Sequence, residues 1–362
     1  MTPVDPDAGG HRLNDAASEP RADVSVSEAT GGNFRLGVIG SFVWDIIYGR
    51  GGRELPVEEH GGITYALGAL DAALPRDWEF VPLVKVGSDL VQQARQYMRT
   101  LKRIAPDAAP IEVPYPNNRV ELHYYSDQRR SEIMSGGVPP WTWAGLQPLL
   151  HDLDALHVNL ISGFELDLET AQLLRQHFRG PIYCDLHSLV LAIGADGARS
   201  LRPLAHVADW MSCFDFIQVN EDEVSMMASD PMELAAIAMA NGVKSLVVTL
   251  GERGAVYFAT PGLRTLADSG RPLHRSGSAT PPKPDFGPVR TELLPAHAPP
   301  NDEIVDPTGC GDVWGATYFA RLLAGDSLTV AMRAAHRAAA LNVAHRGATG
   351  LAAYLRGELS LS

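Results

Sequence analysis

Two glycines, a cysteine and an aspartate stand together at the start of a predicted helix, in the stretch VDPTGCGDVWGATYFARLL of residues 305–323. Glycines in such a turn let successive backbone N–H groups point into one concavity, at the positive end of the helix dipole. Gly309, Cys310 and Gly311 therefore predict a site for an anion such as a phosphate. A carboxylate would normally repel that anion, so Asp312 is expected to act on a neighbouring part of the ligand.

Transfer of a phosphoryl group to an alcohol needs both features. N–H groups stabilise the charge on the moving phosphoryl group, and a carboxylate accepts the proton of the attacking hydroxyl. A carboxylate at a helix N-terminus should stay ionised at neutral pH, because the dipole favours the anion. We predict that Asp312 is the catalytic base and that the backbone of residues 309–311 is the anion hole. The simpler alternative is that Asp312 only caps the helix and that the glycines are ordinary turn residues.

Other motifs that bind phosphates or metals are missing from the sequence. There is no GxxxxGK[ST] motif and no Gly-Lys dipeptide, which excludes a P-loop protein. The stretch GCGDVWG resembles the dinucleotide motif GxGxxG, but Gly315 falls one residue late and no βαβ unit follows. No two histidines have the HxxxH or HExxH spacing, so a catalytic zinc site is not expected.

Composition narrows the class of protein. Of 362 residues, 45% are hydrophobic and 20% charged, which suits a globular protein with a large core. The net charge of −13 leaves no basic face for a nucleic acid, and an anionic ligand would need positive potential concentrated locally. No apolar run is long enough for a membrane helix. Three cysteines without CxxC spacing (Cys184, Cys213 and Cys310) indicate free thiols and a cytoplasmic protein.

The order of apolar segments predicts the architecture. Residues 1–33 carry no hydrophobic period and are expected to be a disordered tail, with one domain over residues 34–362. In that domain short apolar strands alternate with helices, which predicts an α/β fold with a mostly parallel sheet covered on both faces. Strands are expected at 36–39 and within 78–89, 155–163, 181–188, 215–223 and 245–251, and helices within 61–74, 90–104, 169–178 and 232–242.

Two segments depart from this alternation. Residues 117–137 alternate polar and apolar side chains around a polar turn at 126–129, which predicts an antiparallel hairpin. With residues 42–60 this hairpin could form a small separate sheet. Residues 266–300 are dense in Pro, Gly and Ser, and we expect a disordered insertion there, apart from the strand-like RTELL of residues 290–294.

Taken together, the motifs resemble one family. DPTGCGD (306–312) matches the D-x-T-G-A-G-D signature of the ribokinase-like (PfkB) carbohydrate kinases, with Cys310 in place of alanine. Further matches follow the family's order along residues 34–356: LGVIGSFVWD (36–45), the glycine pair 61–62, VKVGSD (84–89), NEDE (220–223), VVTLGERGA (247–255) and AAALNVAHRGA (338–348). The resemblance implies a doubly wound α/β domain with a small β lid. It also implies an ATP- and Mg²⁺-dependent transfer to a hydroxyl of a sugar-like or nucleoside-like substrate.

The resemblance also assigns roles on the nucleotide side. Asn220 and Glu223 match the N-x-x-E motif that orders magnesium and its waters, and residues three apart share one face of a helical turn. A capped, solvated acidic helix start is the alternative for this pair. The resemblance places four further residues beside the nucleotide: Thr308, Gly251, Gly254 and Asn342.

On the substrate side, Asp45 matches an aspartate that binds sugar hydroxyls, and Gly61 and Gly62 let the backbone approach the ligand. Asp312 would contact the same substrate. Many members continue with GGxxxN, whereas this chain has Ala66 at the asparagine position. The loss of a hydroxyl partner puts ribose itself in doubt. Asp185 and His187 could restore polar contacts from the opposite wall, although a surface loop explains them equally well.

Two other functions stay open beside the kinase. One is a catalytically inactive nucleotide- or sugar-binding sensor of the same fold, and the other is a kinase of a vitamin precursor. The resemblance also leaves open a homodimer formed through the lid. A monovalent cation is a further option, near Asp306 and the segment Arg346–Gly347.

Overall fold

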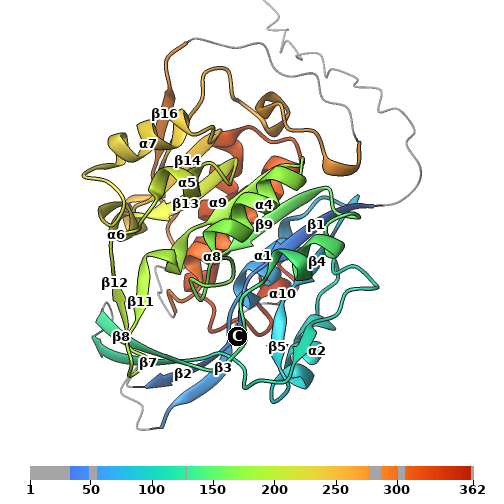
Figure 1. The fold of residues 1–362 in the computed structure, drawn as a ribbon. Coiled ribbons are helices and arrows are strands. Elements are labelled where there is room, and N and C mark those ends of the chain that lie inside the picture. Colours follow the sequence, from blue (N-terminus) through green and yellow to red (C-terminus); the bar gives the residue numbers. More distant parts are fainter. Residues whose placement is uncertain (1–32, 49–54, 127–128, 277–286, 301–305, 360–362) are drawn as a thin grey trace, which may run out of the picture. The chain divides into compact units, whose positions relative to one another are not determined.

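The computed structural model describes residues 33–48, 55–126, 129–276, 287–300 and 306–359 (Figure 1). The predicted disordered tail, residues 1–33, lies outside this part of the chain except for Asn33. The described residues from Asn33 onward form one compact unit.

An eight-stranded sheet forms the centre of this unit (Figure 1). Its strand order is β16 (Arg290–Leu294), β15 (Ala255–Ala259), β14 (Ser245–Thr249), β13 (Phe216–Asn220), β10 (Ile182–Asp185), β9 (Ala155–Asn159), β1 (Phe34–Ile39) and β4 (Trp78–Leu83). Neighbours from β14 to β4 pair in parallel, and β15 and β16 pair antiparallel at the other end. The nearly continuous apolar runs of β9 and β10 are fully buried, as a parallel sheet with two covered faces requires.

Helices cover both faces of the sheet, which confirms the doubly wound α/β prediction. One face packs against α1 (Thr64–Ala73), α2 (Val91–Met98), α8 (Cys310–Leu323), α9 (Leu328–Val343) and α10 (Leu351–Leu355). The other face packs against α3 (Trp143–Leu146), α4 (Leu168–His177), α5 (Val207–Met211), α6 (Glu221–Ser225) and α7 (Pro231–Ala240). None of the helices in the described ranges has the length and apolar character needed to cross a membrane.

A separate four-stranded sheet lies at one end of the strands (Figure 1). Its order is β3 (Val57–Gly62), β2 (Phe42–Tyr48), β7 (Arg119–Ser126) and β8 (Arg129–Ser135). β7 and β8 are the predicted hairpin, with Ser126 opposite Arg129. The apolar side chains of this sheet gather with Ile161 of the main domain, and we call the sheet the lid.

A short hairpin that the sequence did not predict joins the edge of the lid. It consists of β11 (Leu191–Ile193) and β12 (Arg199–Leu201). The N–H of Met134 in β8 donates to the carbonyl of Gly197 at 2.8 Å, and Ile133 pairs with Ala198. The short pieces that complete the fold are β5 (Lys85–Gly87), β6 (Ile111–Val113), η2 (Gln147–Leu149), η3 (His187–Val190) and η4 (Gly251–Arg253).

The expected disordered insertion at 266–300 needs correction. Residues 266–276 contain η5 (Leu266–Ser269) and η6 (His274–Ser276), and RTELL is strand β16 of the main sheet. Arg271 pairs with the buried Asp215 at 2.6 Å, and Arg275 pairs with the buried Asp154 at 2.6 Å. Local composition cannot reveal such distant ion pairs. Residues 277–286 lie outside the described part of the chain.

Candidate active site

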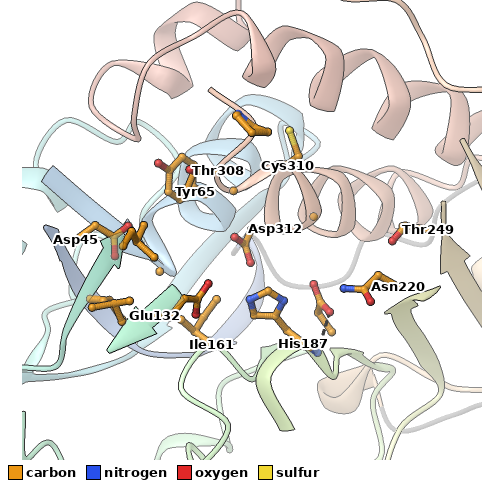
Figure 2. A pocket seen from close by; sticks show the side chains of 18 of the residues that line it. Asp45, Tyr65, Glu132, Ile161, His187, Asn220, Thr249, Thr308, Cys310 and Asp312 are labelled. Carbon is orange, nitrogen blue, oxygen red and sulfur yellow. Dashed lines mark hydrogen bonds between the residues drawn. The ribbon is translucent and has the colours of Figure 1, made fainter. Parts of the chain in front are cut away.

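A cleft of about 310 Å³ lies between the lid and the carboxyl ends of β10, β13 and β14 (Figure 2). Ligands bind at this edge of open α/β sheets, because loops from several strands meet there. The cleft brings together most of the predicted site residues: Asp45, Gly62, Asn220, Glu223, Gly251, Thr308, Gly309, Cys310, Gly311 and Asp312. Three predicted residues do not line it, namely Gly61, Gly254 and Asn342.

Gly309 begins helix α8 and has to be a glycine. It is the N-cap residue with φ of +75°, and a Cβ there would lie 2.2 Å from the ring of Tyr65. The turn is held from below by Asn342 of α9, whose Nδ2 donates to the Thr308 carbonyl at 2.9 Å. Asn342 therefore supports this turn from the core, where it is 1% exposed, and does not line the cleft.

The Cys310 thiol is packed behind the turn. Its Sγ lies 3.8 Å from the Ala339 carbonyl, and Asn342 Nδ2 approaches it at 3.4 Å. Burial raises the pKa of Cys310 to about 12, so the thiol stays protonated. The neutral, buried thiol therefore acts as a filler behind the turn.

Asp312 is the third residue of α8, and Gly309 is the N-cap, so the alternative that Asp312 merely caps the helix is wrong. The carboxylate is 9% exposed and faces the cleft (Figure 2). Nδ2 of Asn159, at the end of β9, donates to Asp312 Oδ1 at 2.7 Å. This bond fixes the orientation of the carboxylate in the middle of the cleft.

Asn220 and Glu223 cap helix α6 and also line the cleft. The Glu223 N–H donates to Asn220 Oδ1 at 2.9 Å, and Glu223 Oε2 accepts from the Asn220 N–H at 2.8 Å. Asn220 Nδ2 also donates to Glu223 Oε1 at 2.6 Å. A carboxylate has about four acceptor positions, so Glu223 retains capacity for a hydrated cation. The cap and the predicted magnesium role are therefore compatible.

His187 supplies positive charge in the middle of this acidic cleft (Figure 2). Its Nδ1 lies 3.7 Å from Glu223 Oε1, and its backbone φ of +28° is unusual for a residue other than glycine. Burial disfavours the imidazolium, but the nearby carboxylates of Glu223, Asp312 and Asp185 outweigh this effect, and the pKa of His187 rises to about 10. Burial raises the pKa of Asp185 well above its usual range, and His187 opposes this shift.

The opposite end of the cleft contains Asp45 of β2 (Figure 2). Gly61 on the neighbouring strand makes room for it, because a Cβ at Gly61 would lie 2.1 Å from Asp45 Oδ2. The walls around Asp45 are apolar and include Val43, Val120, Leu122 and Ile161. Ala66 is buried in α1, whereas Tyr65 lines the cleft with a hydroxyl that has no hydrogen-bond partner among the described residues.

The sequence analysis missed several lining residues, among them the polar Glu132, Arg199 and Gln218. Arg199 Nη1 pairs with Glu132 at 3.3 Å, and its Nη2 donates to the Ile161 carbonyl at 3.0 Å. These contacts join β12 to the lid, and no local signal predicts them. Gly254 instead packs against β16, since a Cβ there would meet the Leu294 carbonyl at 2.0 Å.

Solved structures with the same fold include ribokinase-family kinases. Ribokinase from Thermotoga maritima is 16% identical, with a TM-score of 0.63 over 90% of this chain and 98% of that one. A nucleoside kinase from Burkholderia thailandensis in complex with inosine is 18% identical, with a TM-score of 0.65 over 90% and 97%. Ribokinase from Cryptococcus neoformans in complex with ADP is 17% identical, with a TM-score of 0.59 over 90% and 100%.

The chain thus has the fold of these ribokinase-family kinases. Residues 198–353, which include β13, α6 and the start of α8, match the model of the pfkB family carbohydrate kinases. This match agrees with the family that the motifs resemble. No curated protein sequence matches the chain.

Proposed function

We propose that the protein transfers the terminal phosphoryl group of ATP to a hydroxyl of a sugar-like or nucleoside-like acceptor. The main support is the convergence of Asp312, the turn Gly309–Gly311 and Asp45 on one cleft. The Cryptococcus neoformans ribokinase of the same fold is in complex with ADP, and the nucleoside kinase is in complex with inosine. ADP suits the end of the cleft beside the turn Gly309–Gly311, and inosine suits the end beside Asp45.

Asp312 acts as the base in this proposal. Asn159 holds one carboxylate oxygen, and the other accepts the proton of the acceptor hydroxyl as its oxygen attacks the γ-phosphorus. The bond from the γ-phosphorus to the bridging oxygen breaks, and the electron pair leaves with ADP. The N–H groups in the first turn of α8 lie at the positive end of the helix dipole and stabilise the charge on the moving phosphoryl group.

His187 adds positive charge next to these N–H groups. With a pKa of about 10 its imidazole is protonated at neutral pH, and it partly neutralises the carboxylates that would repel the triphosphate. Local positive charge is what a protein with a net charge of −13 needs in order to bind an anionic donor.

Asn220 and Glu223 would hold magnesium through its water shell. Bound magnesium neutralises triphosphate charge during transfer. A monovalent cation would bind near Asp306, whose N–H donates to the Val343 carbonyl at 2.9 Å and so keeps the turn next to the end of α9. Thr308, Gly251 and Thr249 at this end of the cleft would contact the donor phosphates.

Asp45 would bind acceptor hydroxyls, and the lid would exclude water from the transfer. The apolar walls around Asp45, together with Ala66 in place of asparagine, favour an acceptor with one apolar face. An inosine-like ring fits this description better than a linear polyol does. A ring-shaped vitamin precursor fits it too and is the alternative acceptor.

The test is ADP release from Mg·ATP with ribose, fructose, myo-inositol, inosine and pyridoxine. One acceptor should support turnover, and Asp312→Asn should lower kcat about 10²- to 10⁴-fold without loss of ATP binding. Nearly unchanged turnover in this variant would show that Asp312 is not the base. ATP binding without ADP release for every acceptor would favour the inactive sensor, although the complete DPTGCGD motif argues against it.

A further inference from the structure

Gln218 lies beneath the first turn of α8, close to the anion hole. It is a residue of β13 and is 3% exposed. Its Nε2 donates to the Gly311 carbonyl at 3.1 Å and to Asp185 Oδ2 at 3.0 Å. A peptide unit is planar, so the Gly311 carbonyl and the Asp312 N–H belong to one rigid plane and point in opposite directions. By holding the carbonyl, Gln218 sets the direction of the Asp312 N–H and the position of the Asp312 Cα.

The amide of Gln218 is itself locked in one orientation. The hydroxyl of the fully buried Tyr183 donates to Gln218 Oε1 at 2.6 Å. A rotated amide would place its oxygen against the Gly311 carbonyl, which has no proton to donate. Tyr183 and Asp185 lie on β10, and Asp185 is the register partner of Gln218, so the parallel sheet itself builds this arrangement.

Gly315 makes room for the same pair of side chains. A Cβ at this position would lie 2.2 Å from the Tyr183 hydroxyl and 2.6 Å from Gln218 Oε1. Neither contact could relax cheaply, since both groups are buried and bonded to each other. Position 315, the third glycine of GCGDVWG, therefore requires a glycine, because only glycine leaves room for the hydrogen-bonded pair Tyr183–Gln218 against α8.

We propose that Gln218 is a positioning residue for phosphoryl transfer, oriented by Tyr183 and accommodated by Gly315. It acts by holding the Gly311–Asp312 peptide, which carries both an N–H of the anion hole and the backbone of the base. This role rests on the proposed function, because it treats the turn as a phosphate site.

The experiment uses tungstate, a tetrahedral oxyanion, as the probe of the anion hole in the full-length protein. Gln218→Met keeps the length of the side chain but removes its donors. We expect it to weaken tungstate binding in calorimetry about tenfold, since an orienting group should matter less than a donor, whose loss costs about 100-fold. Tyr183→Phe should weaken it less, because it removes the lock and leaves the amide. With an active acceptor, Gln218→Met should lower kcat more than it changes the acceptor KM.

Trp314→Phe is the matched control. It removes another buried hydrogen bond of α8, from Trp314 Nε1 to His336 Nδ1 at 3.2 Å, on the side that faces α9. It should lower the Tm of the protein as Gln218→Met does and leave tungstate affinity unchanged. Equal affinities in wild type and Gln218→Met, equal losses in Trp314→Phe, or no tungstate binding by the wild type would each overturn the proposal. The tungstate series decides this role whether or not an acceptor turns over, and the Asp312→Asn assay separately decides the proposed function.

Discussion

His157 gives the fold a stability that depends on pH, and replacing it should remove that dependence. It lies on β9 directly under Tyr183, with ring centroids 4.8 Å apart and planes 12° apart. Neither ring nitrogen has a hydrogen-bond partner among the described residues, and the side chain is 1% exposed. Burial therefore disfavours the imidazolium and lowers the pKa of His157 from 6.5 to about 3.

The sign of the effect follows from which state binds the proton. Above pH 6.5 the histidine is neutral in both folded and unfolded chains and contributes no pH dependence. Below pH 6.5 the unfolded chain takes up a proton that the folded chain does not, so the free energy of unfolding falls. Each pH unit costs about 1.4 kcal/mol, which gives a loss of about 2 kcal/mol between pH 7 and pH 5.

His157→Leu keeps a similar volume and cannot titrate. Its free energy of unfolding at pH 7 should lie within about 1.5 kcal/mol of the wild type. Between pH 7 and pH 5 it should lose about 2 kcal/mol less than the wild type does. The measurement is urea unfolding followed by circular dichroism at pH 7, 6 and 5, with unchanged m-values. His151→Leu, which replaces an exposed histidine, is the control and should keep the wild-type slope. An identical slope in His157→Leu would refute the reasoning.

Three further predictions concern the site. Gly309→Ala should lower kcat about 100-fold, because the new Cβ would collide with Tyr65. Gly325→Ala is the control: Gly325 has φ of +87° but open space around it, so this variant should lower stability and leave kcat unchanged. Steady-state kinetics and Tm distinguish the two effects. Gly61→Ala should displace Asp45 and raise the acceptor KM about tenfold while the ATP KM stays the same, and equal changes in both would contradict the assignment of Asp45. Chelation of Mg²⁺ with EDTA should abolish turnover without lowering the Tm, because the capping pair at the start of α6 satisfies its own hydrogen bonds; a large fall in Tm would indicate a structural metal.

The sequence predicted those elements of the fold that depend on neighbouring residues in the chain, such as buried strands and the start of a helix. Buried parallel strands are continuous apolar runs in any context, and the glycine turn announces a helix start through its own residue types. The doubly wound sheet and the lid hairpin were predicted in this way and are confirmed, and the pfkB family model matches residues 198–353. The roles assigned to Asp312, Asn220 and Glu223 stay predictions, although these residues do meet in one cleft.

The features that were missed depend on contacts between distant segments. Residues 266–276 are ordered by two arginines that reach buried aspartates more than 50 positions away, and their composition alone indicates disorder. In the sequence, Gln218 is an ordinary polar residue in a buried strand, and only the packing of α8 against β13 shows its bond to the Gly311 carbonyl. Asn342 was assigned to the nucleotide from its motif, whereas the packing of α9 turns it toward the Thr308 carbonyl.

The hairpin β11–β12 has a consequence for how copies of this chain can associate. An unpaired edge strand is a template for pairing with another chain. The lid has two outer strands, and the outer edge of β8 already pairs at Ile133 with Ala198. In the described part of the chain, β3 is the lid strand whose outer edge pairs with no other strand. A second molecule could therefore extend the lid sheet only along residues Val57–Gly62, because the opposite edge is paired and Arg199 beside it lines the cleft.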